Sequence, residues 1–432
     1  MWERLAQLAI ISERRSLISC RNDYIEPRKG GYIMAAVSVL MKPASGLCNM
    51  ACDYCFYCDE SSKREQASYG MMSEDTLRNV IRKTMLNATG AISFAYQGGE
   101  PSLRGLDFYQ KAIAFQKHFN RSGLRVHNAF QTNGLALDED WCRFFVDHQF
   151  LVGLSVDGTQ ETHDRYRHDS GGNGTFDRVL KTAAMFDHCG VEYNILTVVT
   201  RHTAENIREI YQAYKKRGWR YQQYIICLEP LGTMHGTNDY SLSPEQYGQF
   251  LCDLFGLWYA DWQRGDAPYI RQFENYIGIF LGYPPEACDQ CGVCGIQCAV
   301  EADGSVYPCD FYMLDEDRLG NFNTDRFADI ANRRKKIGFV ERSLRLGREC
   351  LNCRWHPLCR GGCQRHREIV PGENVYANYY CPGYQLFFEH YHSELKQIAK
   401  SMDKHDAAYD HSAMGNISTI SSRGLFNIPN HG

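Results

Sequence analysis

Hydrophobic and polar residues follow two alternating patterns along the first 260 residues of the chain. Six short runs of apolar and β-branched residues indicate strands, at residues 37–42, 91–96, 126–131, 151–156, 192–200 and 222–228. Between them, helical patterns occupy residues 74–87, 106–119, 139–148, 176–188 and 204–217. A longer helical stretch follows at 244–262.

This order predicts an α/β fold made of parallel βα units with right-handed crossovers, which curl into a full or partial barrel. In such barrels, chemistry takes place at the carboxyl ends of the strands. The unusual residues of this chain fall there. A cysteine-rich loop follows the first strand, Gln-Gly-Gly-Glu-Pro ends the second at 97–101, Thr-Asn-Gly ends the third at 132–134, and Ser-Val-Asp-Gly ends the fourth at 155–158.

The cysteine-rich loop has the spacing of an open iron-sulfur site. Cys48, Cys52 and Cys55 are arranged as C-x3-C-x2-C, which holds three irons of a [4Fe-4S] cube and leaves the fourth without a protein ligand. Structural metal sites usually have four protein ligands, so we expect the fourth iron to bind another molecule, with S-adenosylmethionine (SAM) the natural candidate. Cys58 follows at a further x2 spacing, so these four residues alone are also compatible with one closed site, zinc included.

A second group of cysteines indicates a second, metal-dependent domain. Ten of the nineteen cysteines lie between Cys288 and Cys381, among many Gly, Pro and Arg residues. Eight thiols make either two fully ligated four-iron clusters or two zinc sites, and spacing does not separate these alternatives. The eight candidate ligands are Cys288, Cys294, Cys309, Cys350, Cys353, Cys359, Cys363 and Cys381. The other two cysteines of this region, Cys291 and Cys298, are not needed for two four-ligand sites.

These patterns divide the chain into four parts. We expect an N-terminal extension over residues 1–34, the barrel over 35–270, the cysteine-rich domain over 283–385, and a C-terminal helix and tail over 386–432. The two glycines at 98 and 99 permit a ligand to approach the backbone closely. Glu100 and the carbonyls beside it are candidates to accept hydrogen bonds from an ammonium group.

Composition narrows the class of protein. Hydrophobic residues make up 44% and charged residues 23%, as in ordinary globular proteins, and 51 acidic against 47 basic residues give a net charge of −4. We therefore expect neither nucleic acid nor a membrane as a partner. No secretory signal or long apolar segment is evident, so we expect a cytoplasmic protein whose reduced cysteines bind metal.

Together these motifs resemble the radical SAM enzymes with a SPASM-type C-terminal domain, and among them the anaerobic sulfatase-maturating enzymes. The resemblance extends from about Val37 to about Tyr391. It rests on the cysteine loop ending at Tyr57, the Gln-Gly-Gly-Glu-Pro run, Gln-Thr-Asn-Gly ending at Gly134, Val-Gly-Leu-Ser-Val-Asp-Gly ending at Gly158, and Asp-Gly-Ser-Val-Tyr-Pro-Cys-Asp-Phe-Tyr at 303–312. It implies a partial (β/α)6 radical SAM barrel followed by a smaller SPASM domain with two auxiliary iron-sulfur clusters.

The resemblance also implies a role for each motif residue, with three [4Fe-4S] clusters in all. Cys48, Cys52 and Cys55 would bind the catalytic cluster, so that Cys58 is not a ligand. The first auxiliary cluster would use Cys288, Cys294, Cys309 and Cys363, and the second would use Cys350, Cys353, Cys359 and Cys381. The residues expected to contact SAM are Tyr54, Gly99, Ser155, Arg167 and Leu228, and Asp310 is the expected general base.

The function implied is oxidation of a specific Cys or Ser of a sulfatase to Cα-formylglycine. The expected partners are an unfolded or nascent sulfatase carrying a Cys/Ser-x-Pro/Ala-x-Arg segment and a flavodoxin- or ferredoxin-like electron donor. One alternative is a SPASM enzyme that modifies or crosslinks a ribosomal peptide. A third hypothesis, from another class, is a zinc or iron-sulfur binding protein without enzymatic activity.

Overall fold

One large sheet organises the molecule. The computed structural model describes residues 24–28 and 31–413, and its eleven-stranded sheet has the order β11-β10-β9-β2-β3-β4-β5-β6-β7-β8, with β1 paired to β2. Strands β2 to β8 run parallel. They are β2 (Gly31–Met41), β3 (Ala88–Tyr96), β4 (Arg125–Thr132), β5 (Leu151–Ser155), β6 (Tyr193–Val199), β7 (Tyr221–Ile226) and β8 (Tyr269–Ile270).

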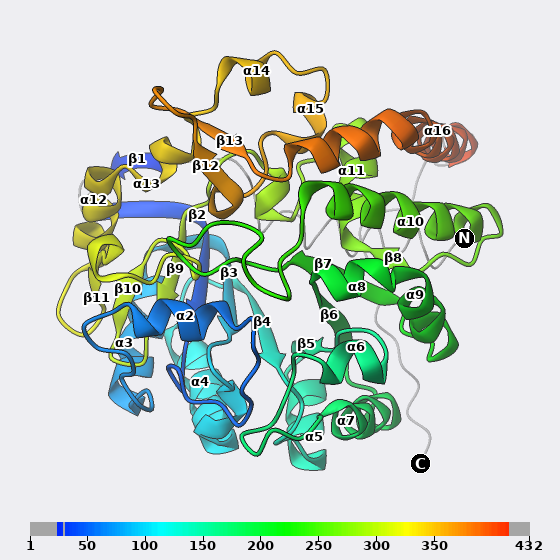
Figure 1. The fold of residues 1–432 in the computed structure, drawn as a ribbon. Coiled ribbons are helices and arrows are strands. Elements are labelled where there is room, and N and C mark those ends of the chain that lie inside the picture. The colour runs from blue at the N-terminus through cyan, green and yellow to red at the C-terminus, as the bar shows by residue number, and fades with distance from the viewer. Residues whose placement is uncertain (1–23, 29–30, 414–432) are drawn as a thin grey trace.

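Amphipathic helices cover the outer face of these strands (Figure 1). In α3, for example, Ser73 caps the N-terminus by accepting a hydrogen bond from the Thr76 amide, and Leu77, Val80 and Ile81 are buried. The helices of this part are α2 (Phe56–Ser62), α3 (Glu74–Met85), α4 (Leu106–Phe119), α5 (Glu139–Asp147), α6 (Gln160–Asp164), α7 (Phe176–Cys189), α8 (Arg201–Glu205) and α9 (Ile207–Lys216), with a 3₁₀ turn η1 (Pro101–Arg104).

The six predicted strands are confirmed, and their carboxyl ends lie within two residues of the predicted ones. One helix prediction was wrong. The stretch 204–217 is not one helix, because α8 begins earlier, at Arg201, where Thr200 caps it, and ends at Glu205, and α9 starts after Asn206. The Asn206 side chain donates to the His202 carbonyl at 2.8 Å, a local bond that competes with helix continuation.

The cysteine-rich part extends the same sheet. Strand β9 (Gln297–Val300) pairs in parallel with β2, and β10 (Ser305–Tyr307) and β11 (Gly320–Asn321) follow in antiparallel order. Its remaining elements are four helices, a hairpin and three 3₁₀ turns, and the hairpin and the last two of the helices lie above the large sheet in Figure 1. They are α12 (Phe327–Ile337), α13 (Phe339–Ser343), α14 (Arg348–Leu351), α15 (His356–Cys359), the hairpin of β12 (Arg367–Ile369) and β13 (Tyr376–Asn378), and 3₁₀ turns η2 (Cys288–Gln290), η3 (Asp315–Asp317) and η4 (Gln364–His366).

Three further helices join the two parts: α10 (Pro244–Gln263), α11 (Arg271–Phe280) and α16 (Cys381–Ala413). Helices α10 and α16 approach closely at Gly248 and Gly383. A Cβ on Gly383 would stand only 2.4 Å from the Pro244 carbonyl oxygen. Beyond this contact, the rings of Phe255 and Phe387 pack with centroids 5.6 Å apart. The C-terminal helix is therefore anchored to the barrel's last helices.

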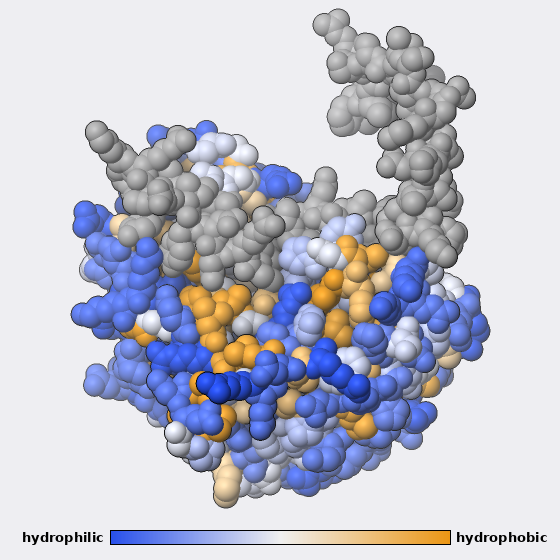
Figure 2. All heavy atoms as spheres, turned by 90° about the horizontal axis from the view of Figure 1, so that it is seen from above, coloured by the Kyte–Doolittle hydropathy of each residue, from blue (hydrophilic) through white to orange (hydrophobic). Residues whose placement is uncertain are grey.

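At the N-terminus, strand structure begins inside the predicted extension. β1 (Tyr24–Arg28) pairs antiparallel with β2, which starts at Gly31. Residues 1–23, 29–30 and 414–432 lie outside the described residues, and the four domain boundaries stay predictions. Seen from above, the molecule shows apolar residues towards its middle and mostly polar ones at its rim (Figure 2). Among the described helices, none has both the length and the apolar character needed to span a bilayer.

Candidate active site

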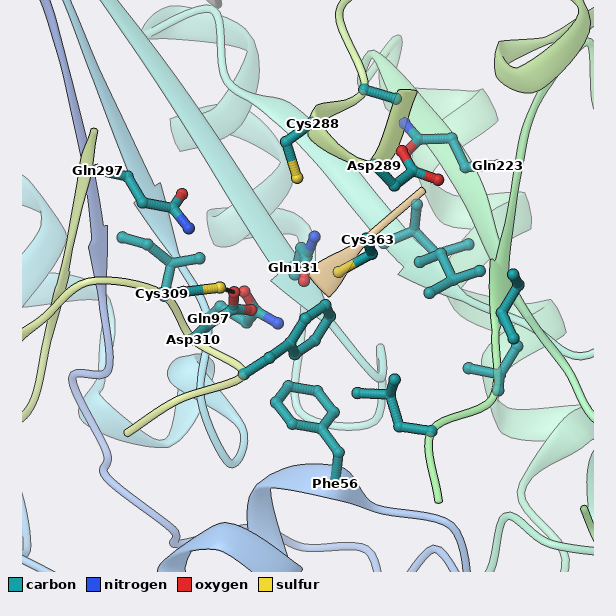
Figure 3. A pocket seen from close by; sticks show the side chains of 18 of the residues that line it. Phe56, Gln97, Gln131, Gln223, Cys288, Asp289, Gln297, Cys309, Asp310 and Cys363 are labelled. Carbon is teal, nitrogen blue, oxygen red and sulfur yellow. Dashed lines mark hydrogen bonds between the residues drawn. The ribbon is translucent and has the colours of Figure 1, made fainter. Parts of the chain in front are cut away.

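A cavity of about 710 Å³ brings the cysteine loop and part of the cysteine-rich domain together. Its wall includes the carboxyl ends of β4, β5, β6 and β7, where chemistry is expected in a barrel. From the loop, Cys48, Cys52 and Cys55 line it. From the second domain, Cys288, Cys294, Cys309, Cys363 and Asp310 line it, and Figure 3 shows Asp310 beside Cys309 on the cavity wall.

The cysteine loop is held against the end of β3 by backbone contacts. The Gly99 amide donates to the Ser45 carbonyl and the Glu100 amide to the Leu47 carbonyl, both at 2.8 Å. A Cβ on Gly99 would stand only 2.0 Å from the Leu47 carbonyl oxygen. Glycine is therefore needed at position 99 because the loop backbone occupies the space of a side chain.

Glu100 has a structural task besides the expected one. Its buried carboxylate accepts hydrogen bonds from the Ser102 amide and hydroxyl, the Thr132 hydroxyl at 2.9 Å and the Asn133 amide at 2.8 Å. Glu100 also lines the cavity, and a hydrogen bond from a ligand to its carboxylate stays a prediction. The Asn133 side chain in turn donates to Asn49 at 2.7 Å, next to Cys48. The ends of β3 and β4 are thus tied to the cysteine loop.

The loop thiols lie in different electrostatic environments. Burial raises the pKa of Cys48 to about 11. It also raises the pKa of Cys52 to about 12, although the positive charge of Arg167 acts to lower the pKa of Cys52. A hydrogen bond from Cys58 lowers the pKa of Cys55 to about 6, although burial opposes it. Cys58 itself is exposed on α2 and is not among the residues that line the cavity. A bound metal deprotonates such thiols, so binding would release protons from Cys48 and Cys52.

All five residues expected to contact SAM line this cavity, and they are Tyr54, Gly99, Ser155, Arg167 and Leu228. Arg167 is only 7% exposed, so it is not a solvated surface arginine. Its Nε donates to Asp157 at 2.8 Å, and Tyr54 donates to the same carboxylate. Burial alone would lower the pKa of Arg167, but Asp157 raises it well above its usual value. The arginine is thus fixed as a cation in the cavity wall.

Asp157 is a site residue that the sequence analysis missed. Besides Arg167 and Tyr54 it accepts from the Val198 amide at 2.9 Å, which ties β6 to the end of β5. The signal for it was present, since Asp157 belongs to the Ser-Val-Asp-Gly run at a strand end. Arg167, however, lies ten residues further along the chain, and the sequence does not show that it pairs with Asp157.

In the second domain, the thiols fall into two groups. Cys288, Cys294, Cys309 and Cys363 line the cavity, and burial raises the pKa of each. The Cys309 sulfur lies 3.6 Å from Asp310 Oδ1. The second group is absent from the cavity wall and lies on or beside α14, α15 and the first turn of α16. It consists of Cys350, Cys353, Cys359 and Cys381. Burial raises the pKa of Cys359, and negative charge on the other three thiols of this group raises it further.

The cavity wall includes polar residues both from the motifs and from outside them. Gln97 and Gln131, which begin the Gln-Gly-Gly-Glu-Pro and Gln-Thr-Asn-Gly runs, point into the cavity, and so does Gln223 of β7 (Figure 3). Arg271 donates to Gln223 at 2.9 Å and stands near Asp289, whose pKa is raised by burial although Arg271 opposes the shift. Gln223, Arg271 and Asp289 belong to no motif, and only the fold places them at the site.

Comparison with known proteins defines the class. Residues 43–214 match the radical SAM superfamily, and residues 285–354 match the SPASM iron-sulfur cluster-binding domain. The chain therefore combines a radical SAM part with an iron-sulfur binding part. A cysteine-type anaerobic sulfatase-maturating enzyme of Clostridium novyi is 41% identical over 85% of this chain and 99% of that protein. A serine-type enzyme of Bacteroides thetaiotaomicron is 31% identical over 82% of this chain and 88% of that protein.

A solved structure agrees with this relationship. Native anSMEcpe with bound AdoMet, another abbreviation of SAM, is 40% identical and superimposes with a TM-score of 0.80 over 85% of this chain and 100% of that one. The chain belongs to the family of anaerobic sulfatase-maturating enzymes, which are radical SAM enzymes.

The contact at Gly99 can be tested by substitution. We expect Gly99→Ala to displace the cysteine loop, because its Cβ would collide with the Leu47 carbonyl. Anaerobically reconstituted protein should then lose roughly one third of its iron, the share of one of the three expected clusters. Gly46→Ala is the control, since a Cβ there meets only the Ser61 hydroxyl at 3.9 Å. Full iron content in the Gly99→Ala protein would contradict the contact.

The buried pair of Asp157 and Arg167 can be tested by unfolding. Asp157→Asn leaves Arg167 as an uncompensated buried charge, so we expect the free energy of unfolding to fall by about 3 kcal/mol. Anaerobic urea titration measures this change. Asp239→Asn removes an exposed partner of Arg165 and should leave the unfolding midpoint nearly unchanged. Equal midpoints for the two variants would show that the buried pair does not stabilise the site.

Proposed function

We propose that this chain oxidises a Cys or Ser residue of a sulfatase to Cα-formylglycine by radical SAM chemistry. The observation that carries the proposal is the single cavity whose wall holds both the three-thiol loop and Asp310. A substrate side chain in this cavity lies between a site for radical formation and a base. The serine-type and cysteine-type relatives support the same reaction for this chain.

Each thiol group has a proposed role. Cys48, Cys52 and Cys55 hold the catalytic [4Fe-4S] cluster, which when reduced supplies the electron that cleaves SAM and yields a 5′-deoxyadenosyl radical. Two auxiliary clusters make three in all. We assign Cys288, Cys294, Cys309 and Cys363 to the first and Cys350, Cys353, Cys359 and Cys381 to the second.

The cavity wall orients SAM and excludes water from it. Arg167, held by Asp157, offers a guanidinium to the SAM carboxylate, and Leu228 is a buried apolar contact. Tyr54 and Ser155 complete the set with the backbone at Gly99. Glu100 is engaged within the protein, so backbone carbonyls of the Gln-Gly-Gly run are the acceptors we propose for the SAM ammonium.

Asp310 is the proposed general base. A base must reach the proton that it removes, and the Asp310 carboxylate faces the cavity. The target side chain loses a Cβ hydrogen atom to the 5′-deoxyadenosyl radical, which becomes 5′-deoxyadenosine, and it also loses its thiol or hydroxyl proton and one further electron. Asp310 takes the proton, and the electron leaves on the side of the cavity lined by Cys309 and Cys363. A serine gives the aldehyde directly, whereas a cysteine gives a thioaldehyde that water hydrolyses.

The finer identity of the substrate rests on the relatives. The cysteine-type relative is 41% identical and the serine-type relative 31%, so we propose cysteine as the preferred target. A related structure holds anSMEcpe with AdoMet and the Cp18Cys peptide, which supports a peptide substrate here. We propose an unfolded or nascent sulfatase with a Cys/Ser-x-Pro/Ala-x-Arg segment, a flavodoxin- or ferredoxin-like electron donor and a cytoplasmic location.

Matched peptides test the reaction and its target. Reduced, reconstituted protein is incubated anaerobically with SAM and with two sulfatase peptides that differ only in Cys or Ser. We expect mass spectrometry to show the aldehyde product from both, and faster from the Cys peptide. A mass that indicates a crosslink, without aldehyde, would favour the ribosomal-peptide alternative. Absence of SAM cleavage would favour a binding protein without enzymatic activity.

The role of Asp310 is tested by Asp310→Asn. We expect aldehyde formation to fall by about 10²- to 10⁴-fold, because a general base typically contributes this much. Iron content and SAM cleavage without peptide should remain. Glu316→Gln removes an equal charge from the nearby surface and should have full activity. Unchanged activity of Asp310→Asn would exclude Asp310 as the base.

A further inference from the structure

Lys42 is a fully buried lysine beside the cysteine loop. It follows β2 directly, and its amide donates to the Val300 carbonyl at 2.8 Å. The side chain is 0% exposed, and its Nζ has no hydrogen-bond partner among the described residues. A buried ammonium group without a partner is strongly unfavourable. The fold therefore requires an anionic partner for Lys42.

The surroundings of Lys42 stabilise a cation. Its Nζ lies 4.3 Å from the ring centroid of Tyr57 and 5.6 Å from that of Phe56, the two residues that follow Cys55. Aromatic faces attract cations, more strongly when both are away from water. On the other side, the Lys42 stem lies against Gly98, at 3.2 Å from the position that a Cβ would take, and Gly98 lines the cavity. Lys42 thus stands between the Gly98 turn and the cysteine loop.

The buried carboxylates nearby form no ion pair with Lys42. Glu301 is taken by Arg64 at 2.8 Å and by the Tyr57 hydroxyl. Glu60 is also fully buried, and its Oε1 has no hydrogen-bond partner among the described residues. Burial raises the pKa of Glu60 to about 8, although the charge of Lys42 opposes this shift. Phe56 and Tyr57, whose rings lie beside the Lys42 ammonium, follow Cys55 directly, so the thiolate site of the loop is a further anionic group next to Lys42.

We infer that Lys42 is the counter-ion of the N-terminal cluster and makes that cluster easier to reduce. The inference rests on the proposed function, which places a [4Fe-4S] cluster at Cys48, Cys52 and Cys55. A four-iron core with three thiolates has a net negative charge and gains another on reduction. A fixed ammonium in a low-dielectric site stabilises the more negative state, so it raises the reduction potential. Lys42 is a positioning residue that acts through the cluster and touches no substrate.

The test compares reduction potentials of charge-removing and charge-keeping variants. Holoproteins carrying Lys42→Met, Lys42→Gln or Lys42→Arg are titrated anaerobically and followed by electron paramagnetic resonance. Subtracting the spectrum of a variant without Cys48, Cys52 and Cys55 isolates the N-terminal cluster. We expect the two neutral variants to show at least a tenfold lower ratio of reduced to oxidised cluster at a given potential, a shift of 59 mV for one electron. Lys42→Arg should stay near the parent value.

Lys63, the residue that follows α2, provides the control. Lys63 pairs with Asp59 at the exposed end of α2, so Lys63→Met removes an equal charge from a solvated position. It should leave the potential unchanged. Loss of the cluster in both neutral variants but not in Lys42→Arg would also support the counter-ion role. Unchanged potentials in the neutral variants, or loss of the cluster in all three including Lys42→Arg, would overturn it. If the parent protein itself lacks this cluster, the proposed function fails instead.

Discussion

The site depends on one close approach between two backbone segments. The cysteine loop lies so near the end of β3 that Gly99 has no room for a Cβ, and two backbone hydrogen bonds of 2.8 Å fix the contact. The carboxylate of Glu100 extends this attachment to β4 through Thr132 and Asn133. Because three short loops are joined in this way, the thiols of the loop face the cavity at a defined position. A flexible loop would not hold a cluster with one iron turned towards SAM.

A second constraint brings Asp310, the proposed base, to the same cavity. Strand β9 adds to the barrel sheet beside β2, and β10 returns antiparallel to it. Pro308, Cys309 and Asp310 follow β10 directly, so the sheet itself delivers Asp310 to the cavity wall. The radical SAM part and the cysteine-rich part therefore share one framework. Electrostatics complete the site, because buried cations at Arg167 and Lys42 stand beside thiols that become anionic when metal binds.

Much of this could be predicted from the sequence because its signals are local. Apolar runs predicted the six parallel strands, and the resemblance to the radical SAM enzymes implied residues of the cavity wall, Tyr54, Ser155 and Asp310 among them. Long-range contacts could not be predicted. The pairing of β9 with β2, the ion pair of Asp157 with Arg167 and the burial of Lys42 each join segments whose patterns are independent of one another. The four donors to Glu100 could not be predicted for the same reason, since they come from the folded arrangement.

The central claim is that the thiols of Cys48, Cys52 and Cys55 leave one iron open towards the cavity. Electron-nuclear double resonance of the reduced holoprotein tests this most directly, using SAM labelled with ¹⁵N in its amino group or ¹⁷O in its carboxylate. The account predicts hyperfine coupling of both labels to the N-terminal cluster. Absence of coupling in a protein with full iron content, or a fourth cysteine ligand on that cluster, would contradict it.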